Sequence, residues 1–204
     1  EMQRSLVGSE MCIRDSIRSA AFESMCPGNA PSDMLLDYHR SVAAGGIGMT
    51  TVAYAAVTQS GLSFDRQLWM RPEIIPGLRR LTDAIHAEGA AAGIQLGHCG
   101  NMSHKSICGC MPVGASSGFN LYSPTFVRGL RADELPEMAR AYGRSVNLAR
   151  EAGFDSVEIH AGHGYLISQF LSPSTNHRKD EFGGSLQNRM RFMDMVMELS
   201  LIHI

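Results

Sequence analysis

The chain alternates helix-type and strand-type hydrophobic patterns, and this alternation limits the fold more than any other feature. Ile74, Leu78, Leu81 and Ile85 recur at spacings of four, three and four, which predicts a helix with one buried face. The short apolar run that follows, residues 91–96, is typical of a buried strand. Strands that alternate with helices form a parallel sheet covered by helices, so the chain is predicted to be an α/β protein.

The same alternation extends over most of the sequence. Ser32 or Asp33 can cap the first helix, and Gly45-Gly46 is a typical helix stop. Helices are predicted over residues 32–45, 74–88, 135–152 and from about 185 onward, and strands over 17–21, 48–53, 91–96 and 155–160.

Two sheet closures fit such a pattern, an open doubly wound sheet and a barrel. No Gly-x-Gly-x-x-Gly turn follows any predicted strand, which disfavours the dinucleotide-binding open sheet. Polar side chains instead follow three successive strands at the same end. They are Tyr54, Gln95 with His98, and His160 with His163 and Tyr165. The prediction is a (β/α)8 barrel, or TIM barrel, present as roughly its first four β/α units. The long connection from Gly97 to Asp133 is expected to cover the active site.

Composition excludes several classes of function. The net charge of −2 offers no basic surface for nucleic acid or for a membrane, and no apolar run reaches the roughly 20 residues of a spanning helix. The five cysteines have irregular spacing, so we expect no disulfide framework and a cytoplasmic location. Cys99, His104, Cys108 and Cys110 match no familiar zinc spacing and are predicted to be free loop residues.

The two ends of the chain share an unusual relationship. The codons CTG-TCT-CTT-ATA-CAC-ATC encode residues 199–204, and their reverse complement, read in a shifted frame, encodes residues 11–15. This DNA resembles a transposon end used to tag sequencing libraries. We therefore expect residues 1–16 and 199–204 to be translated adapter, and residues 17–198 to be the N-terminal half of the barrel domain.

His160, His163 and Tyr165 are the strongest candidates for chemistry. Two converging imidazoles can donate N–H groups to an oxygen that gains negative charge, and a neutral phenol can give a proton. On spacing alone, two hydrogen-bonded loop histidines and a packing tyrosine are the slightly favoured interpretation. A metal pair is a third interpretation, but it needs a further ligand, to which the sequence does not point.

A longer motif surrounds these residues. The run VEIHAGHGYLISQFLSP, residues 157–173, resembles the signature of the old yellow enzyme family, which comprises FMN-dependent ene-reductases and related NAD(P)H oxidoreductases. The resemblance continues through Asn176, Arg178, Asp180 and the segments 183–185, 188–189 and 191–192. It reaches back over residues 94–100 and, more weakly, 18–21, and so covers essentially all of residues 17–198.

The resemblance implies roles for individual residues. His160 and His163 match the pair that binds the carbonyl oxygen of the substrate, and Tyr165 matches the proton donor to its α-carbon. The cofactor-binding positions implied are Gln95, Tyr54 and the end of the first strand, formed by Ser19, Ala20, Ala21 and Phe22. Phe22 and Ser24 stand where one subgroup carries a cysteine and a tyrosine, so the redox tuning of that subgroup is not expected here.

The resemblance also implies a reaction, in which hydride passes from NADH or NADPH through FMN to an activated alkene such as an α,β-unsaturated carbonyl. The alternatives are a metal-dependent barrel hydrolase that uses His160 and His163, and an inactive truncated barrel. Half a barrel lacks the usual phosphate-binding loops, so we expect the chain alone to bind FMN poorly and to associate. The expected partner is a small molecule, and a homo-oligomer of the full-length protein is left open.

Overall fold

The computed structural model describes residues 14–121 and 124–201, without the side chain of Leu201. Most of the predicted adapter segments, residues 1–13 and 202–204, therefore lie outside the described residues. The structure does describe parts of both segments. The carbonyl of Ser16 accepts hydrogen bonds from the N–H groups of Gly48 and Met49, and the last helix continues through Leu199 and Ser200.

Four parallel strands form the main sheet: β1 (Ile17–Arg18), β2 (Met49–Ala56), β3 (Ala91–Gly97) and β7 (Ser156–Ile159). Their order in space, β1-β2-β3-β7, is also their order in the chain. A doubly wound sheet reverses direction at a switch point, whereas a barrel adds each new strand beside the last. The strand order is therefore that of a barrel wall. The predicted first strand is shorter than expected and ends at Arg18.

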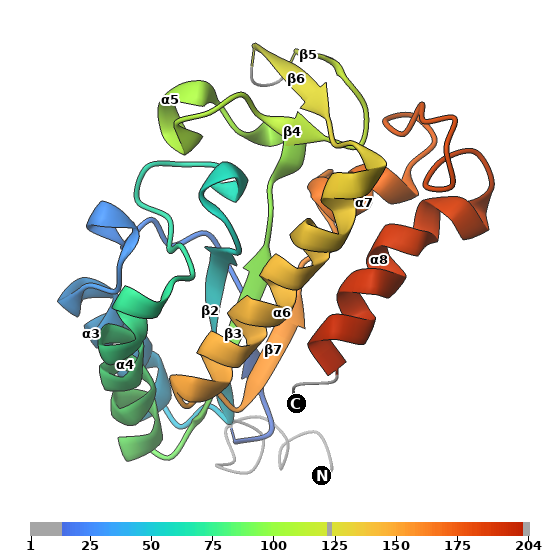
Figure 1. Cartoon of the computed structure of the whole chain (residues 1–204). Coiled ribbons are helices and arrows are strands. Elements are labelled where there is room, and N and C mark those ends of the chain that lie inside the picture. Colours follow the sequence, from blue (N-terminus) through green and yellow to red (C-terminus); the bar gives the residue numbers. More distant parts are fainter. Residues whose placement is uncertain (1–13, 122–123, 202–204) are drawn as a thin grey trace, which may run out of the picture.

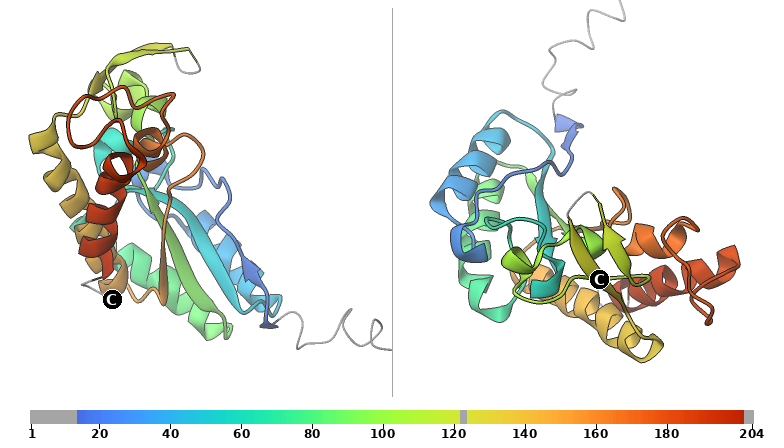
Figure 2. Two further views of the ribbon diagram at one scale, coloured as in Figure 1. Left: turned by 90° about the vertical axis from the view of Figure 1, so that its right-hand side faces the viewer. Right: turned by 90° about the horizontal axis from the view of Figure 1, so that it is seen from above.

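The helices that follow the strands lie on one side of this sheet. They are α3 (Asp33–Ala44), α4 (Ile75–Ala87), α6 (Leu135–Glu151) and α8 (Leu186–Leu201). Seen from above in Figure 2, they form an arc around the strands. The Ser32 hydroxyl caps α3 by accepting the N–H of Leu35, as predicted.

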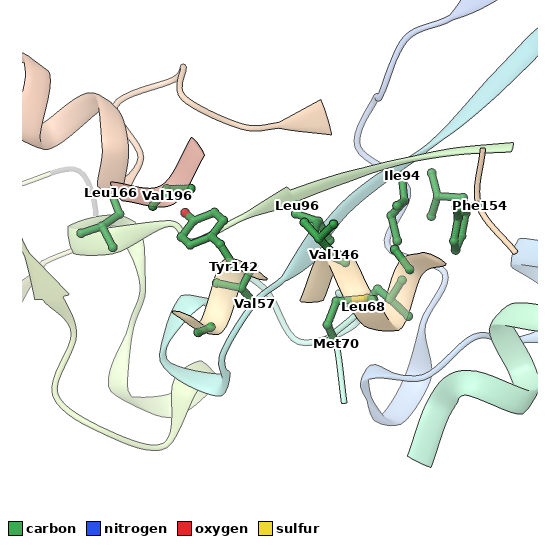
Figure 3. Packing of buried hydrophobic residues seen from close by; sticks show 14 of the residues in the cluster. Val57, Leu68, Met70, Ile94, Leu96, Tyr142, Val146, Phe154, Leu166 and Val196 are labelled. Atoms are coloured by element: carbon green, nitrogen blue, oxygen red, sulfur yellow. The ribbon is translucent and has the colours of Figure 1, made fainter. Parts of the chain in front are cut away.

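The main core fills the space between the sheet and this arc of helices (Figure 3). Ile94 and Leu96 of β3 are fully buried, and Tyr142 and Val146 of α6 pack in the same cluster. Leu78, Leu81 and Ile85 are fully buried on α4, so the predicted helix face is confirmed. Each such buried aliphatic side chain contributes about 1.5–3 kcal/mol, which fixes the strands that carry the site.

The connection between β3 and α6 folds over the upper ends of the strands (Figure 1). This segment, residues 98–134, is called the cover below. It contains α5 (Lys105–Cys108) and a small sheet of β4 (Val113–Gly114), β5 (Gly118–Asn120) and β6 (Thr125–Gly129) in the order β4-β6-β5. The segment lies at the end of the sheet where the sequence places it, its covering of the site stays a prediction, and the small sheet was not predicted.

The remaining elements are short. The six-residue helix α7 (Leu166–Leu171) follows β7 and was also not predicted. The 3-10 helices are Pro27–Asn29, Gln59–Gly61, Pro72–Ile74, Gly100–Met102 and Ala132–Glu134. Within the part of the chain that the structure describes, no helix is both long and apolar enough to cross a membrane.

Candidate functional site

A pocket of about 260 Å³ opens at the carboxyl ends of the barrel strands. It brings together eight of the nine residues proposed from the sequence, from four separate segments of the chain. Ser19 is the exception, because it is exposed and does not line this pocket. The lining residues are Ala20, Ala21, Phe22, Glu23, Ala53, Tyr54, Phe64, Gln95, His160, His163 and Tyr165.

The turn after β7 presents the two histidines and the tyrosine together. His163 adopts a left-handed conformation with φ of 55°, which turns its ring back toward His160. The two rings hydrogen-bond, with 3.1 Å between His163 Nδ1 and His160 Nε2. The ring centroid of Tyr165 lies 5.0 Å from that of His160, edge to face. The three groups therefore form one cluster at the pocket wall.

Hydrogen bonds within the turn, to His98 and from Gln169 hold the main chain of this turn in place. The Tyr165 N–H donates to Gly162 O at 3.1 Å, and the Leu166 N–H donates to His98 O at 2.9 Å. The Gln169 side chain, 1% exposed, donates to Gly164 O at 2.6 Å. These hydrogen bonds hold the main chain of the turn and do not involve the phenol. The Tyr165 hydroxyl has no hydrogen-bond partner among the described residues, so it is available to a bound molecule.

The environment of His160 favours its neutral form. Burial lowers the pKa of His160, and the neighbouring His163 lowers it further, against an opposing effect of Glu158. A neutral imidazole has one N–H donor and one acceptor nitrogen. His160 can therefore donate to a neutral or anionic oxygen without adding a full positive charge to the pocket.

Another part of the pocket is suited to a flat ring. Ala20, Ala21 and Ala53 contribute no side-chain atoms beyond Cβ, so a planar group can approach the main chain there. The Gln95 amide donates from Nε2 to Glu158 Oε1 at 2.7 Å. Its amide oxygen has no hydrogen-bond partner among the described residues, which leaves an acceptor for a ring N–H.

Sequence reasoning missed Glu23, which also lines the pocket. Its carboxylate lies 3.1 Å from Arg18 Nη1 and 3.0 Å from His39 Nε2, and its side chain is 5% exposed. It also accepts the N–H of Ala53 at 3.2 Å, where the register of β2 shifts between Val52 and Ala55. An irregularity of this kind can re-aim a side chain, and Tyr54 lies within it.

Tyr54 lines the pocket through its ring and not through its hydroxyl. The hydroxyl donates to Ser63 Oγ at 2.9 Å, and burial strongly raises the pKa of the phenol. Phe64, a second residue missed from the sequence, lies 4.5 Å from Phe22 between ring centroids. Phe64 lies far from Phe22 in the sequence, so no local sequence pattern indicates that the two rings meet.

His98 was expected beside Gln95 at the strand end, but it lies inside the protein. It is fully buried, accepts the Gly100 N–H at Nδ1 and lies 3.1 Å from Ser60 Oγ at Nε2. Burial lowers its pKa to about 3. His98 therefore joins the start of the cover to the 3-10 helix Gln59–Gly61 and does not line the pocket.

Metal-ligand geometry is not found around the two histidines. Over residues 14–121 and 124–201, no group of three or more His, Cys, Asp or Glu side chains is placed to hold a metal ion. Cys99 and Cys108 are buried, whereas Cys110 is exposed.

Comparison with protein families gives one match that spans nearly the whole chain. The model of the NADH:flavin oxidoreductase / NADH oxidase family matches residues 11–199. The chain is 40% identical over 182 residues to the 4,4'-dithiodibutanoate disulfide reductase of Rhodococcus erythropolis, covering 89% of this chain and 45% of that protein. It is 38% identical over 169 residues to an NADPH dehydrogenase of Listeria monocytogenes serotype 4a, covering 82% and 49%. The chain thus spans about half the length of these curated relatives.

Solved structures show the same relationship in three dimensions. The old yellow enzyme homologue from Zymomonas mobilis superposes with a TM-score of 0.86 at 29% identity, over 92% of this chain and 56% of that one. Morphinone reductase in complex with tetrahydroNAD gives 0.86 at 26% identity, over 91% and 56%. The predicted fold, an α/β parallel sheet forming part of a barrel, is confirmed.

Proposed function

The chain belongs to the NADH:flavin oxidoreductase / NADH oxidase family, and we propose that its pocket is the site of an FMN-dependent NAD(P)H oxidoreductase that reduces activated alkenes. The observation that carries this proposal is the joint presence, in one pocket, of a free phenol, a pair of imidazoles and an alanine-lined area beside Gln95. The proposed substrate is an α,β-unsaturated carbonyl compound. Because the chain spans about half of its relatives, the activity is proposed for the protein with a complete barrel.

The residues present fit the ring of FMN. Ala20, Ala21 and Ala53 leave room for a flat group against the main chain, and the Gln95 amide oxygen can accept a ring N–H. Phe22 and Phe64 form an aromatic edge at the same pocket. When bound, FMN supplies the hydride, which it takes from NADH or NADPH.

The two histidines are proposed to bind the carbonyl oxygen of the substrate. Their facing nitrogens, His160 Nε2 and His163 Nδ1, are hydrogen-bonded to one another, so a substrate oxygen must replace that bond. Both nitrogens can donate only if His160 is protonated at Nε2 and His163 at Nδ1. Two such donors stabilise the negative charge that develops on the oxygen more than they stabilise the ground state.

Tyr165 is proposed to donate a proton to the α-carbon of the substrate. Its hydroxyl has no hydrogen-bond partner among the described residues, whereas the hydroxyl of neighbouring Tyr54 donates to Ser63. Tyr54 is therefore the natural control, because it lines the same pocket with its hydroxyl already engaged.

The test is a comparison of two half-reactions in FMN-loaded protein. In Tyr165→Phe, alkene reduction is expected to slow by about 10²–10⁴-fold, while flavin reduction by NAD(P)H, followed by bleaching of the flavin band, stays close to wild type. In Tyr54→Phe, both half-reactions are expected to be much less affected. Equal loss of both half-reactions in Tyr165→Phe would contradict the proton-donor role.

The sequence also left a metal-dependent hydrolase open, and colour and metal analysis separate it from the FMN enzyme. An FMN enzyme shows a flavin absorption band, whereas a hydrolase of this kind contains stoichiometric zinc. We expect the 204-residue chain alone to hold FMN weakly, because barrel phosphate sites use loops after the last two of eight strands. Tight stoichiometric FMN on the isolated chain would contradict that expectation.

A further inference from the structure

Two cysteines of the cover lie close enough to react with one another. Helix α5 ends at Cys108, and Gly109 then adopts a left-handed conformation with φ of 72°. Only a residue without Cβ adopts this conformation without strain, and the turn brings the chain back on itself. As a result, Cys110 Sγ lies 3.8 Å from Cys108 Sγ. Both thiols are free, as the sequence predicted, and the structure places them side by side.

The two thiols differ in their access to solvent. Cys110 is exposed and lines a groove of about 640 Å³ between the cover and α6. Cys108 is 2% exposed, and its S–H donates to Cys110 O at 3.2 Å. Cys26 and Cys99 are buried as well, and burial raises the pKa of each to about 12. Among the cysteines that the structure describes, Cys110 is therefore the one that a molecule in the groove can reach.

We propose that Cys108 and Cys110 form a reversible dithiol–disulfide pair that is oxidised by low-molecular-weight disulfides entering this groove. In the first step, the Cys110 thiolate attacks one sulfur of the small disulfide and releases one small thiolate. In the second, the Cys108 thiolate attacks Cys110 Sγ, closes the Cys108–Cys110 disulfide and releases the second small thiolate. The small disulfide is reduced by two electrons, the protein dithiol is oxidised by two, and the two thiol protons pass to solvent or to the released thiolates.

The geometry assigns the two roles. The attacking thiol must be reachable, which selects Cys110, and the resolving thiol must lie next to the mixed disulfide, which selects Cys108. Closing the bond brings the sulfurs to about 2.05 Å, and the flexible Gly109 allows this approach. Burial and the neighbouring Cys108 raise the pKa of Cys110, against an opposing effect of Arg128, so the exchange is best measured at mildly alkaline pH. This inference is independent of flavin binding.

The test is differential alkylation of the whole chain with glutathione disulfide as the probe. Trypsin, which cleaves after Lys and Arg, releases Cys108 and Cys110 on one peptide, residues 106–128. Cys12, Cys26 and Cys99 fall on separate peptides, residues 5–14, 19–40 and 81–105. After incubation with glutathione disulfide, alkylation in denaturant and digestion, peptide 106–128 is expected to lack both alkyl groups and to weigh two hydrogens less than its dithiol form. Prior reduction is expected to restore both alkyl groups. The peptide that carries buried Cys99 is the internal control and should remain alkylated.

Two variants separate the roles of the thiols. In Cys108→Ser, Cys110 is expected to accumulate as a mixed disulfide with glutathione. In Cys110→Ser, the buried Cys108 is expected to react at least about ten-fold more slowly than Cys110 does in wild type. The alkylation pattern of the wild-type chain needs no variant, so it remains informative even if a substitution impairs folding. The proposal is overturned if wild-type Cys110 stays glutathionylated beside an alkylatable Cys108, if both cysteines remain alkylatable, or if the disulfide forms between chains.

Discussion

Buried His98 should make the protein sensitive to mild acid. It is fully buried, accepts the Gly100 N–H and lies against Ser60, and burial lowers its pKa from 6.5 to about 3. In the unfolded chain the imidazole takes up a proton below about pH 6.5, whereas in the folded protein it does not. The stability that neutral His98 provides is therefore present above pH 6.5 and is lost as the pH falls toward 3.

The size of the effect follows from this difference in pKa. Below the unfolded pKa, each pH unit lowers the free energy of unfolding by about 1.4 kcal/mol for one such histidine. Because the loss sets in gradually around the unfolded pKa, His98 is expected to cost about 1.5–2 kcal/mol between about pH 6.5 and pH 5. Carboxylates with lowered pKa, such as Asp133 and Glu134, contribute mainly below this window, since their ordinary values are 3.8 and 4.5.

The assay is urea unfolding at several pH values, followed through the fluorescence of Trp69, the single tryptophan. His98→Asn is expected to be less stable at neutral pH but to lose about 1.5–2 kcal/mol less than wild type between pH 6.5 and pH 5. His104→Asn is the matched control, because His104 lies in the same cover segment but is exposed. An unchanged pH dependence in His98→Asn would refute the reasoning, since His98 would then titrate normally in the folded protein.

Three further substitutions test the packing around the site. Gly97→Ala places a Cβ 3.0 Å from Tyr54 and 3.3 Å from His160. FMN binding, measured by flavin fluorescence quenching, is therefore expected to weaken about ten-fold, and the free energy of unfolding is expected to fall by about 1–3 kcal/mol. Gly118→Ala, where nothing lies within 4 Å, should leave both quantities unchanged. Glu23→Ala leaves the half-buried Arg18 and the buried His39 without their shared carboxylate and is expected to lower the free energy of unfolding by about 3 kcal/mol. Glu23→Gln, which keeps an acceptor for the Ala53 N–H, should cost about half as much. Asn176→Ala removes two 2.7 Å hydrogen bonds to the carbonyls of Phe170 and Phe182, and it is expected to lower the free energy of unfolding, measured with urea, by about 2–3 kcal/mol. The control Asn147→Ala, at an exposed position, should lower it by about 0.5 kcal/mol or less.

Local patterns in the sequence were sufficient for the frame of the fold. The period of apolar residues in α4 has a direct physical cause, because one helix face must be buried, and Leu78, Leu81 and Ile85 are fully buried as that pattern predicts. The small sheet of the cover escaped prediction because its strands have two to five residues, too few to show a period. Helix α7, with six residues, escaped for the same reason.

The candidate site was predictable where its residues share one segment. His160, His163 and Tyr165 lie within six positions, and the structure places them in one pocket as the motif suggested. Glu23 could not be found in this way, because its partners come from β1, α3 and β2 and depend on the folded topology. His98 shows the converse error, since a polar residue at a strand end need not face the site when the following loop provides its hydrogen bonds.

The left-handed backbone at His163 has a consequence for engineering. A residue with Cβ costs about 1–2 kcal/mol in this conformation, and glycine removes that cost. His163→Gly is therefore expected to stabilise the fold while it deletes one of the two proposed oxygen-binding groups. Selection for thermal stability alone would favour glycine at this position, whereas selection for turnover would keep the histidine. Variants at position 163 that are selected for thermal stability should therefore also be screened for activity.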